Sequence, residues 1–229
     1  MRRLALALVA MAMVAAAYAW IAPMSSRDVH HFRLTVEVDT PDGVRSGSSV
    51  VEVERKDVTW LPVPGPRHEF RVRGEAVFVD LGSGRHVVAV LAHGENAEDV
   101  SRIITLWVGA YGRYKWDEDV WSGRTELQGT VELKPPLIPT LVTFADPLDP
   151  ETVRVVRPGE FERVFGPGFR FRRATLEVVP ASVPVTSGAI EQRLPWLSGM
   201  KTNLAGTRGA STNDLRERLT PLEFRRQDP

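Results

Sequence analysis

The chain has 229 residues, and its 29 lysines and arginines are balanced by 29 aspartates and glutamates. Hydrophobic residues make up 43% of the chain, which is too many for an intrinsically disordered protein. The net charge of zero argues against a general nucleic-acid binder, because such proteins carry a basic excess. The absence of cysteine excludes disulfides, thiolate metal sites, a cysteine nucleophile and a lipid-modified N-terminal cysteine.

The N-terminus has the pattern of an export signal. Arg2 and Arg3 precede an uncharged, apolar run over 4–22, and Ala17-Tyr18-Ala19 fits the small-x-small pattern of a cleavage site. We expect a signal peptide cut after Ala19 or an uncleaved membrane anchor, because about 20 apolar residues span a bilayer. The two arginines keep the N-terminus in the cytoplasm. The sequence therefore predicts an exported protein, either periplasmic or anchored in the inner membrane with its domain in the periplasm.

Two β-hairpins are predicted in the first half of the exported part. Apolar and polar residues alternate over 32–39, an Asp-Gly turn follows, and the chain returns over 44–55. The second hairpin joins 76–81 to 86–91 through a Gly-Ser-Gly turn. Between the hairpins, the prolines of 57–75 predict an irregular segment.

The strongest helix pattern lies at 96–111. Its apolar residues follow the spacing of one helix face, and acidic residues near its start suit the helix dipole. A strand over 103–108 competes with this prediction, because Ile-Ile-Thr-Leu-Trp-Val is also typical of strands. The sequence leaves both alternatives open.

Short strands and short helices are predicted in the second half, at 126–134, 137–144, 153–156, 160–165, 169–179 and 189–194. From 198 to 229, glycines and small polar residues dominate, which predicts a flexible C-terminal tail with one short helix. The domain organisation expected is a signal or anchor at 1–22, a single β-rich periplasmic domain at 23–197 and the tail. The fold class expected is mainly β, an antiparallel sheet that is sandwich-like or a partly open barrel, with one or two short helices, and α+β is the alternative.

Four aromatic residues in one short stretch are the candidate binding residues: Tyr111, Tyr114, Trp116 and Trp121. Aromatic rings interleaved with basic residues can stack on a carbohydrate or a peptide. They can equally cover the core. The basic strand at 170–173 is a second feature that favours a binding role.

Chemical sites are poorly supported by the sequence. Asp146 and Asp149 offer the best pair of carboxylates for acid–base work, although Asp-Pro pairs also initiate turns. His30 and His31 are adjacent, so a strand directs them to opposite faces, which is poor geometry for one metal ion. We therefore predict no metal and no cofactor, and no catalytic residue is identified.

Several stretches resemble a group of proteobacterial exported proteins. They are TFADPLDPETV at 143–153, FGPG at 165–168, and 184–197, which ends IEQRLPWL; LTVEV at 34–38 and GSSVVEV at 47–53 are similar too. The resemblance implies a signal peptide or membrane anchor and one soluble domain. It implies no activity and no site.

Two functional hypotheses follow. The first is a non-enzymatic binding or structural module of the cell envelope. Its partner would be a protein or a glycan, it would bind no nucleic acid, and it would touch the membrane only through 4–22 if that segment is uncleaved. The alternative is a carboxylate-dependent hydrolase, which would require Asp146 and Asp149 to line one cleft.

Overall fold

The computed structural model describes residues 27–57, 68–94, 97, 103–113, 118–121, 126–207 and 214–226. The predicted signal or anchor at 1–22 lies outside these ranges. Within them, no helix combines the length and the apolar character that a membrane crossing needs.

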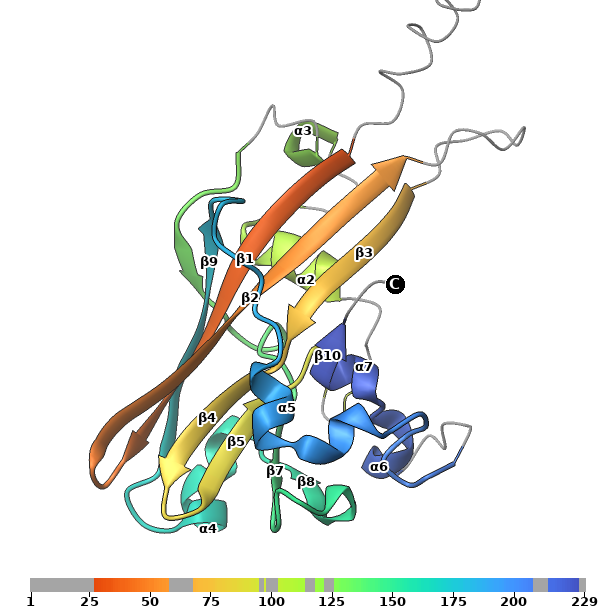
Figure 1. Ribbon diagram of the computed structural model, residues 1–229. Coiled ribbons are helices and arrows are strands. Elements are labelled where there is room, and N and C mark those ends of the chain that lie inside the picture. The colour runs from red at the N-terminus through yellow and green to blue at the C-terminus, as the bar shows by residue number, and fades with distance from the viewer. Residues whose placement is uncertain are drawn as a thin grey trace, which may run out of the picture.

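The first sheet has six strands in the order β10-β3-β2-β1-β9-β6 (Figure 1). Its centre is the long hairpin of β1 (Arg27–Thr40) and β2 (Gly43–Asp57), in which Phe32 pairs with Val51. The flanking strands are β3 (His68–Glu75), β9 (Arg170–Val179), β6 (Thr130–Glu132) and β10 (Arg225–Arg226). The predicted first hairpin is therefore confirmed, with strands longer than the alternation indicated.

The second sheet has four strands, β4 (Val77–Gly82), β5 (Arg85–Ala89), β7 (Leu141–Phe144) and β8 (Val153–Val155), in that order. Every strand pair in both sheets is antiparallel. Among the residues that the structure describes, neither sheet closes on itself into a barrel. The two antiparallel sheets confirm the mainly β prediction. The second hairpin, β4–β5, is also confirmed.

The two sheets approach closely where β4 crosses β2. A Cβ atom at Gly47 would lie 2.2 Å from the carbonyl oxygen of Phe78, so only glycine fits at this crossing. The chain passes from β3 to β4 through Gly74, whose φ of +141° is accessible to glycine. Gly47 therefore permits the close approach of the two sheets, and Gly74 lies just before the chain passes from the first sheet to the second.

Alternation along β1 builds the larger of two apolar cores. Phe32, Leu34, Val36 and Val38 are buried on its inner face, together with residues of β4 and β5. The opposite face of the second sheet packs a separate core around Val88 and against the C-terminal helices. The second sheet is therefore the middle layer, between the first sheet and the C-terminal segment (Figure 1).

The helices are short: α2 (Ile103–Ala110), α3 (Glu118–Trp121), α4 (Phe161–Phe165), α5 (Ala189–Arg193), α6 (Leu215–Arg218) and α7 (Pro221–Phe224). Single 3-10 turns lie at Pro150–Thr152, Pro158–Glu160 and Pro195–Ser198. Because α2 is helical, the competing strand at 103–108 was wrong.

Strand β3 corrects the expected irregular segment at 57–75. Phe70 and Val72 alternate with Arg71 and Arg73, which is itself a strand pattern. The nearby prolines, which lie outside the described residues, were given too much weight over this alternation.

The C-terminal segment also differs from expectation, since its described residues do not form a flexible tail. Leu204, Leu219 and Phe224 are buried in the second core, and β10 pairs with β3. The short helix expected at 214–219 is present as α6. Apolar side chains that are widely spaced among glycines and polar residues thus pack this segment against the second sheet.

Candidate functional site

A loop that follows β9 crosses the outer face of the first sheet. We call residues 181–188 the strap (Figure 1). At its centre, the Thr186 N–H donates to the Val50 carbonyl at 3.0 Å, and the Val50 N–H donates to the Thr186 hydroxyl at 2.8 Å. The strap is therefore attached to β2 in the manner of a one-residue strand.

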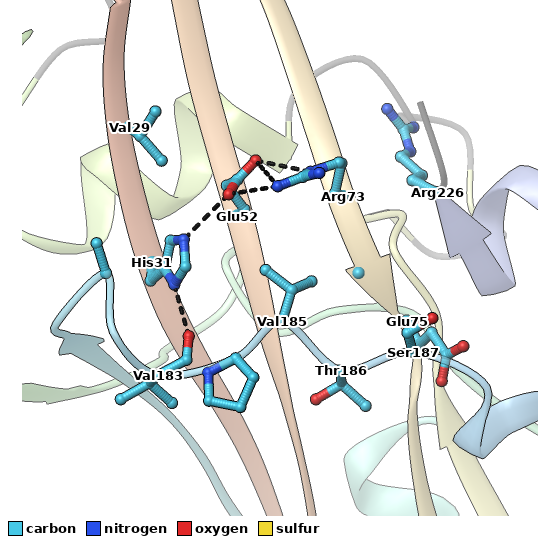
Figure 2. Close-up of a pocket in the computed structure, with 13 residues that line it drawn as sticks. Val29, His31, Glu52, Arg73, Glu75, Val183, Val185, Thr186, Ser187 and Arg226 are labelled. Carbon is cyan, nitrogen blue, oxygen red and sulfur yellow. Dashed lines mark hydrogen bonds and ion pairs between the residues drawn. The ribbon is translucent and has the colours of Figure 1, made fainter. Parts of the chain in front are cut away.

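The strap and the first sheet enclose a pocket of about 740 Å³, here called the sheet pocket. Its base is polar and comes from three neighbouring strands, whereas Val29, Val183 and Val185 supply apolar walls (Figure 2). Glu75 and Arg226 lie at its far end. The pocket joins segments more than 100 residues apart in the sequence.

His31, Glu52 and Arg73 form a row across the base of the sheet pocket (Figure 2). Their strands place them side by side, because His31 pairs with Glu52 in one ladder and Glu52 pairs with Arg73 in the next. Arg73 donates to both carboxylate oxygens of Glu52 at 2.7 Å, and His31 Nε2 lies 3.1 Å from Glu52 Oε2. The hydrogen bonds from Arg73 lower the pKa of Glu52, with a smaller opposing effect from burial.

The His31 ring is fully engaged. Its Nδ1 lies 2.9 Å from the Val183 carbonyl and its Nε2 faces the Glu52 carboxylate. Both ring nitrogens therefore face oxygen atoms of the protein. Because both nitrogens contact protein oxygens, His31 connects the strap to the sheet and is poorly placed to act on a substrate as a general base.

Glu75 fixes the other end of the strap. Its carboxylate accepts hydrogen bonds from Ala189 N at 2.9 Å, Ile190 N at 3.0 Å and Gly188 N. The residue is only 1% exposed. Its charge is compensated by N–H groups at the start of α5, and the strap is thereby held at both ends.

The structure describes two of the four aromatic candidates, Tyr111 and Trp121. Trp121 is 1% exposed and packs edge-on against His30, with ring centroids 4.9 Å apart. Tyr111 is half-buried, its hydroxyl donates to the Leu176 carbonyl at 2.9 Å, and burial raises its pKa to about 12. Trp121 therefore serves the core and has no face for a ligand. Tyr114 and Trp116 lie outside the described residues, so stacking by those two stays a prediction.

Asp146 and Asp149 lie in an exposed turn. Asp146 Oδ1 accepts from Leu148 N at 2.9 Å, and Asp149 Oδ1 accepts from Glu151 N at 3.0 Å. These are the local hydrogen bonds by which aspartates stabilise turns. The two carboxylates line no common cleft, so the condition set for the hydrolase hypothesis is not met.

The basic strand at 170–173 is paired with acidic residues of β1. Arg172 donates to Asp39 at 3.0 Å, and Arg173 donates to Glu37 at 2.8 Å. These arginines are more than 40% exposed, so each pair contributes little to stability. The strand is therefore not an uncompensated basic surface.

Among the described residues, the histidines do not form a metal site. His30 and His31 lie on opposite faces of β1, as their adjacent positions in a strand predicted. His86 is buried between Phe78 and Phe144, stacked at 5.1 Å and 6.1 Å between centroids. His93 Nε2 lies 3.1 Å from the Leu137 carbonyl. In the ranges that the structure describes, no three His, Asp or Glu side chains gather as metal ligands.

Comparison of the chain with protein-family models, with curated proteins and with solved structures gave no match.

Proposed function

We propose that this chain is an exported binding module of the cell envelope, which recognises a protein or glycan partner without catalysing a reaction. The sheet pocket carries the proposal. Its polar base is locked by internal hydrogen bonds, and its valine walls offer a preformed apolar recess. Recesses of this kind, apolar with a few fixed polar groups, are typical of binding sites.

The same geometry supports binding over catalysis. Glu52 accepts from both Arg73 and His31, and His31 is held by two oxygens. A general acid or base must place the atom that gives or takes the proton within hydrogen-bond distance of the substrate. At the floor of the sheet pocket, the His31 nitrogens and the Glu52 carboxylate are hydrogen-bonded to other protein groups.

Export is tested by fractionation followed by N-terminal sequencing. A periplasmic protein that begins at Trp20 would establish cleavage after Ala19, and an intact N-terminus in the inner-membrane fraction would establish anchoring. A cytoplasmic protein with its leader intact would overturn the proposed location.

Binding at the sheet pocket is tested by photo-crosslinking in the living cell. A photoreactive phenylalanine analogue replaces Val185 in the wall of the pocket, and the same analogue replaces exposed Glu162 on α4 as the control. We expect a defined adduct at Val185 only, identified by mass spectrometry as protein or by lysozyme digestion as glycan. Equal adducts at both positions, or none at Val185, would overturn the proposal.

A further inference from the structure

A second pocket lies on the other side of the strap from the sheet pocket. It has a volume of about 350 Å³ and is bounded by β2, β4 and α5. We call it the edge pocket, and the residues that matter in it are Arg45, Ser46, Ser48, Phe78, Asp80 and Arg193. Thr186 contributes to both pockets, so the strap separates them.

The edge pocket adjoins an open stretch of strand edge. β2 pairs with β1 along its whole length, but it pairs with β3 only from Glu52 to Asp57. Next along this edge, Val50 is bonded to Thr186 of the strap. Beyond Val50, no ladder of described residues occupies the edge.

The main chain of this stretch faces the edge pocket. In an antiparallel strand, alternate residues direct their N–H and C=O groups to the same side. Val50 directs both groups away from β1, towards Thr186. Ser48 and Ser46 follow at steps of two, so each presents a donor and an acceptor to the pocket.

The side chains around this edge carry net positive charge. Arg193 lies over the Phe78 ring at 5.4 Å from its centroid, and it is 3.9 Å from Asp80. Both members of that ion pair are more than half exposed, so the pair is weak and easily exchanged. Among the described residues, Arg45 forms no ion pair, which leaves two guanidinium groups for one carboxylate.

From this combination we infer that the edge pocket binds an extended peptide segment that ends in a free C-terminal carboxylate. The peptide would add to β2 beside the strap, with its main chain on Ser46 and Ser48 and its carboxylate on the arginines. An inorganic anion could accept hydrogen bonds from the arginines and from the N–H groups of the edge, but it would leave the carbonyls of Ser46 and Ser48 without donors. Alternating donors and acceptors match a peptide backbone. The inference rests on the proposed role in binding and names a ligand class for this second site.

The test uses the full chain and a library of hexapeptides with free C-termini, compared with the same library amidated. We expect the free-acid peptides to be retained at least tenfold more strongly. Arg45→Gln with Arg193→Gln should abolish the difference, whereas Arg154→Gln, an exposed arginine on β8, should not. Equal retention of both libraries, or retention unaffected by the double variant, would overturn the inference.

Ser48→Pro tests whether the strand edge takes part in binding, and displacement by phosphate tests whether an anion alone can fill the site. Proline removes the N–H that faces the pocket and is tolerated on open strand edges. We expect peptide retention to fall at least fivefold, with the urea midpoint of the variants checked to establish folding. Unchanged retention in folded Ser48→Pro, or full displacement of the peptides by millimolar inorganic phosphate, would reduce the site to an anion site. Crosslinking at Val185 probes the sheet pocket and is independent of these outcomes. Failure of the peptide tests at the edge pocket would therefore leave the proposed function standing.

Discussion

Thr186 and Val50 exchange two hydrogen bonds, one between main chains and one through the threonine hydroxyl. This pair fastens the middle of the strap to β2, while His31 and Glu75 hold its two sides. The strap thereby becomes a fixed wall shared by the sheet pocket and the edge pocket. Because three separate strands contribute to its attachment, both pockets depend on correct assembly of the first sheet.

Thr186→Val should destabilise the protein by about 1–2 kcal/mol, because it leaves the Val50 N–H without its acceptor in a partly buried place. Thr186→Ser keeps the hydroxyl and should lie close to wild type. Urea unfolding of the purified proteins measures both. A Thr186→Val protein as stable as wild type would show that water replaces the hydroxyl and that the strap is less firmly attached than the geometry indicates.

Glu52→Gln should lower the free energy of unfolding at pH 7 by about 1–2 kcal/mol, because two charge-assisted partners lose their carboxylate. Because Arg73 is half-exposed, solvent screens its interaction with Glu52, and the loss of stability stays moderate. Since the pKa of Glu52 is lowered in the folded state, its stabilisation is present above pH 4.5 and is lost as the pH falls through the folded-state pKa. The difference between variant and wild type should therefore shrink in acid.

Glu132→Gln is the matched control for this prediction. Glu132 is exposed and pairs with Lys134 on the surface, so its replacement should leave the urea midpoint unchanged within error. Equal effects of the two substitutions would mean that the Glu52 row contributes no more than a surface ion pair.

Local patterns were sufficient to predict the strands, since alternation in β1 places His30 inside and His31 outside without any knowledge of neighbours. Local alternation could not predict that His31, Glu52 and Arg73 form a row in the sheet pocket. His31 meets Glu52 only through the register of the first hairpin, and it meets Val183 across 152 residues of chain. No periodicity in a single sequence encodes a contact of that separation.

The errors in the sequence interpretation have a common physical origin. The sequence left Trp121 open between a ligand-stacking surface and the core, and the structure shows that it fills space beneath β1 and β3 beside His30 and Phe70. Leu219 and Phe224 were assigned to a flexible tail because their neighbours are polar, yet each is fully buried. In both cases burial is decided by the surface that a segment meets in the fold, which local composition does not contain.

His86 should make the protein less stable in mild acid. Burial lowers the pKa of its imidazole below the ordinary value of 6.5, so the unfolded chain binds a proton that the folded chain excludes. Stability is therefore complete above pH 6.5 and declines as the pH falls below it. In His86→Gln this contribution is removed, and the decrease in urea midpoint between pH 7.5 and pH 5.5 should be smaller than in wild type. Parallel profiles would show that His86 is protonated equally in both states.

Trp121→Ala should destabilise the protein by about 3–5 kcal/mol, as expected when a large buried aromatic residue leaves a cavity. The ring contacts His30 and Phe70 and lies 5.5 Å from the Arg55 guanidinium, so its loss loosens the inner face of β1, β2 and β3 together. Trp121→Phe keeps part of this packing and should cost clearly less. Urea unfolding at pH 7.5 separates a core role from a ligand-stacking role. A Trp121→Ala protein with wild-type stability and impaired partner binding would support the ligand-stacking alternative for this residue.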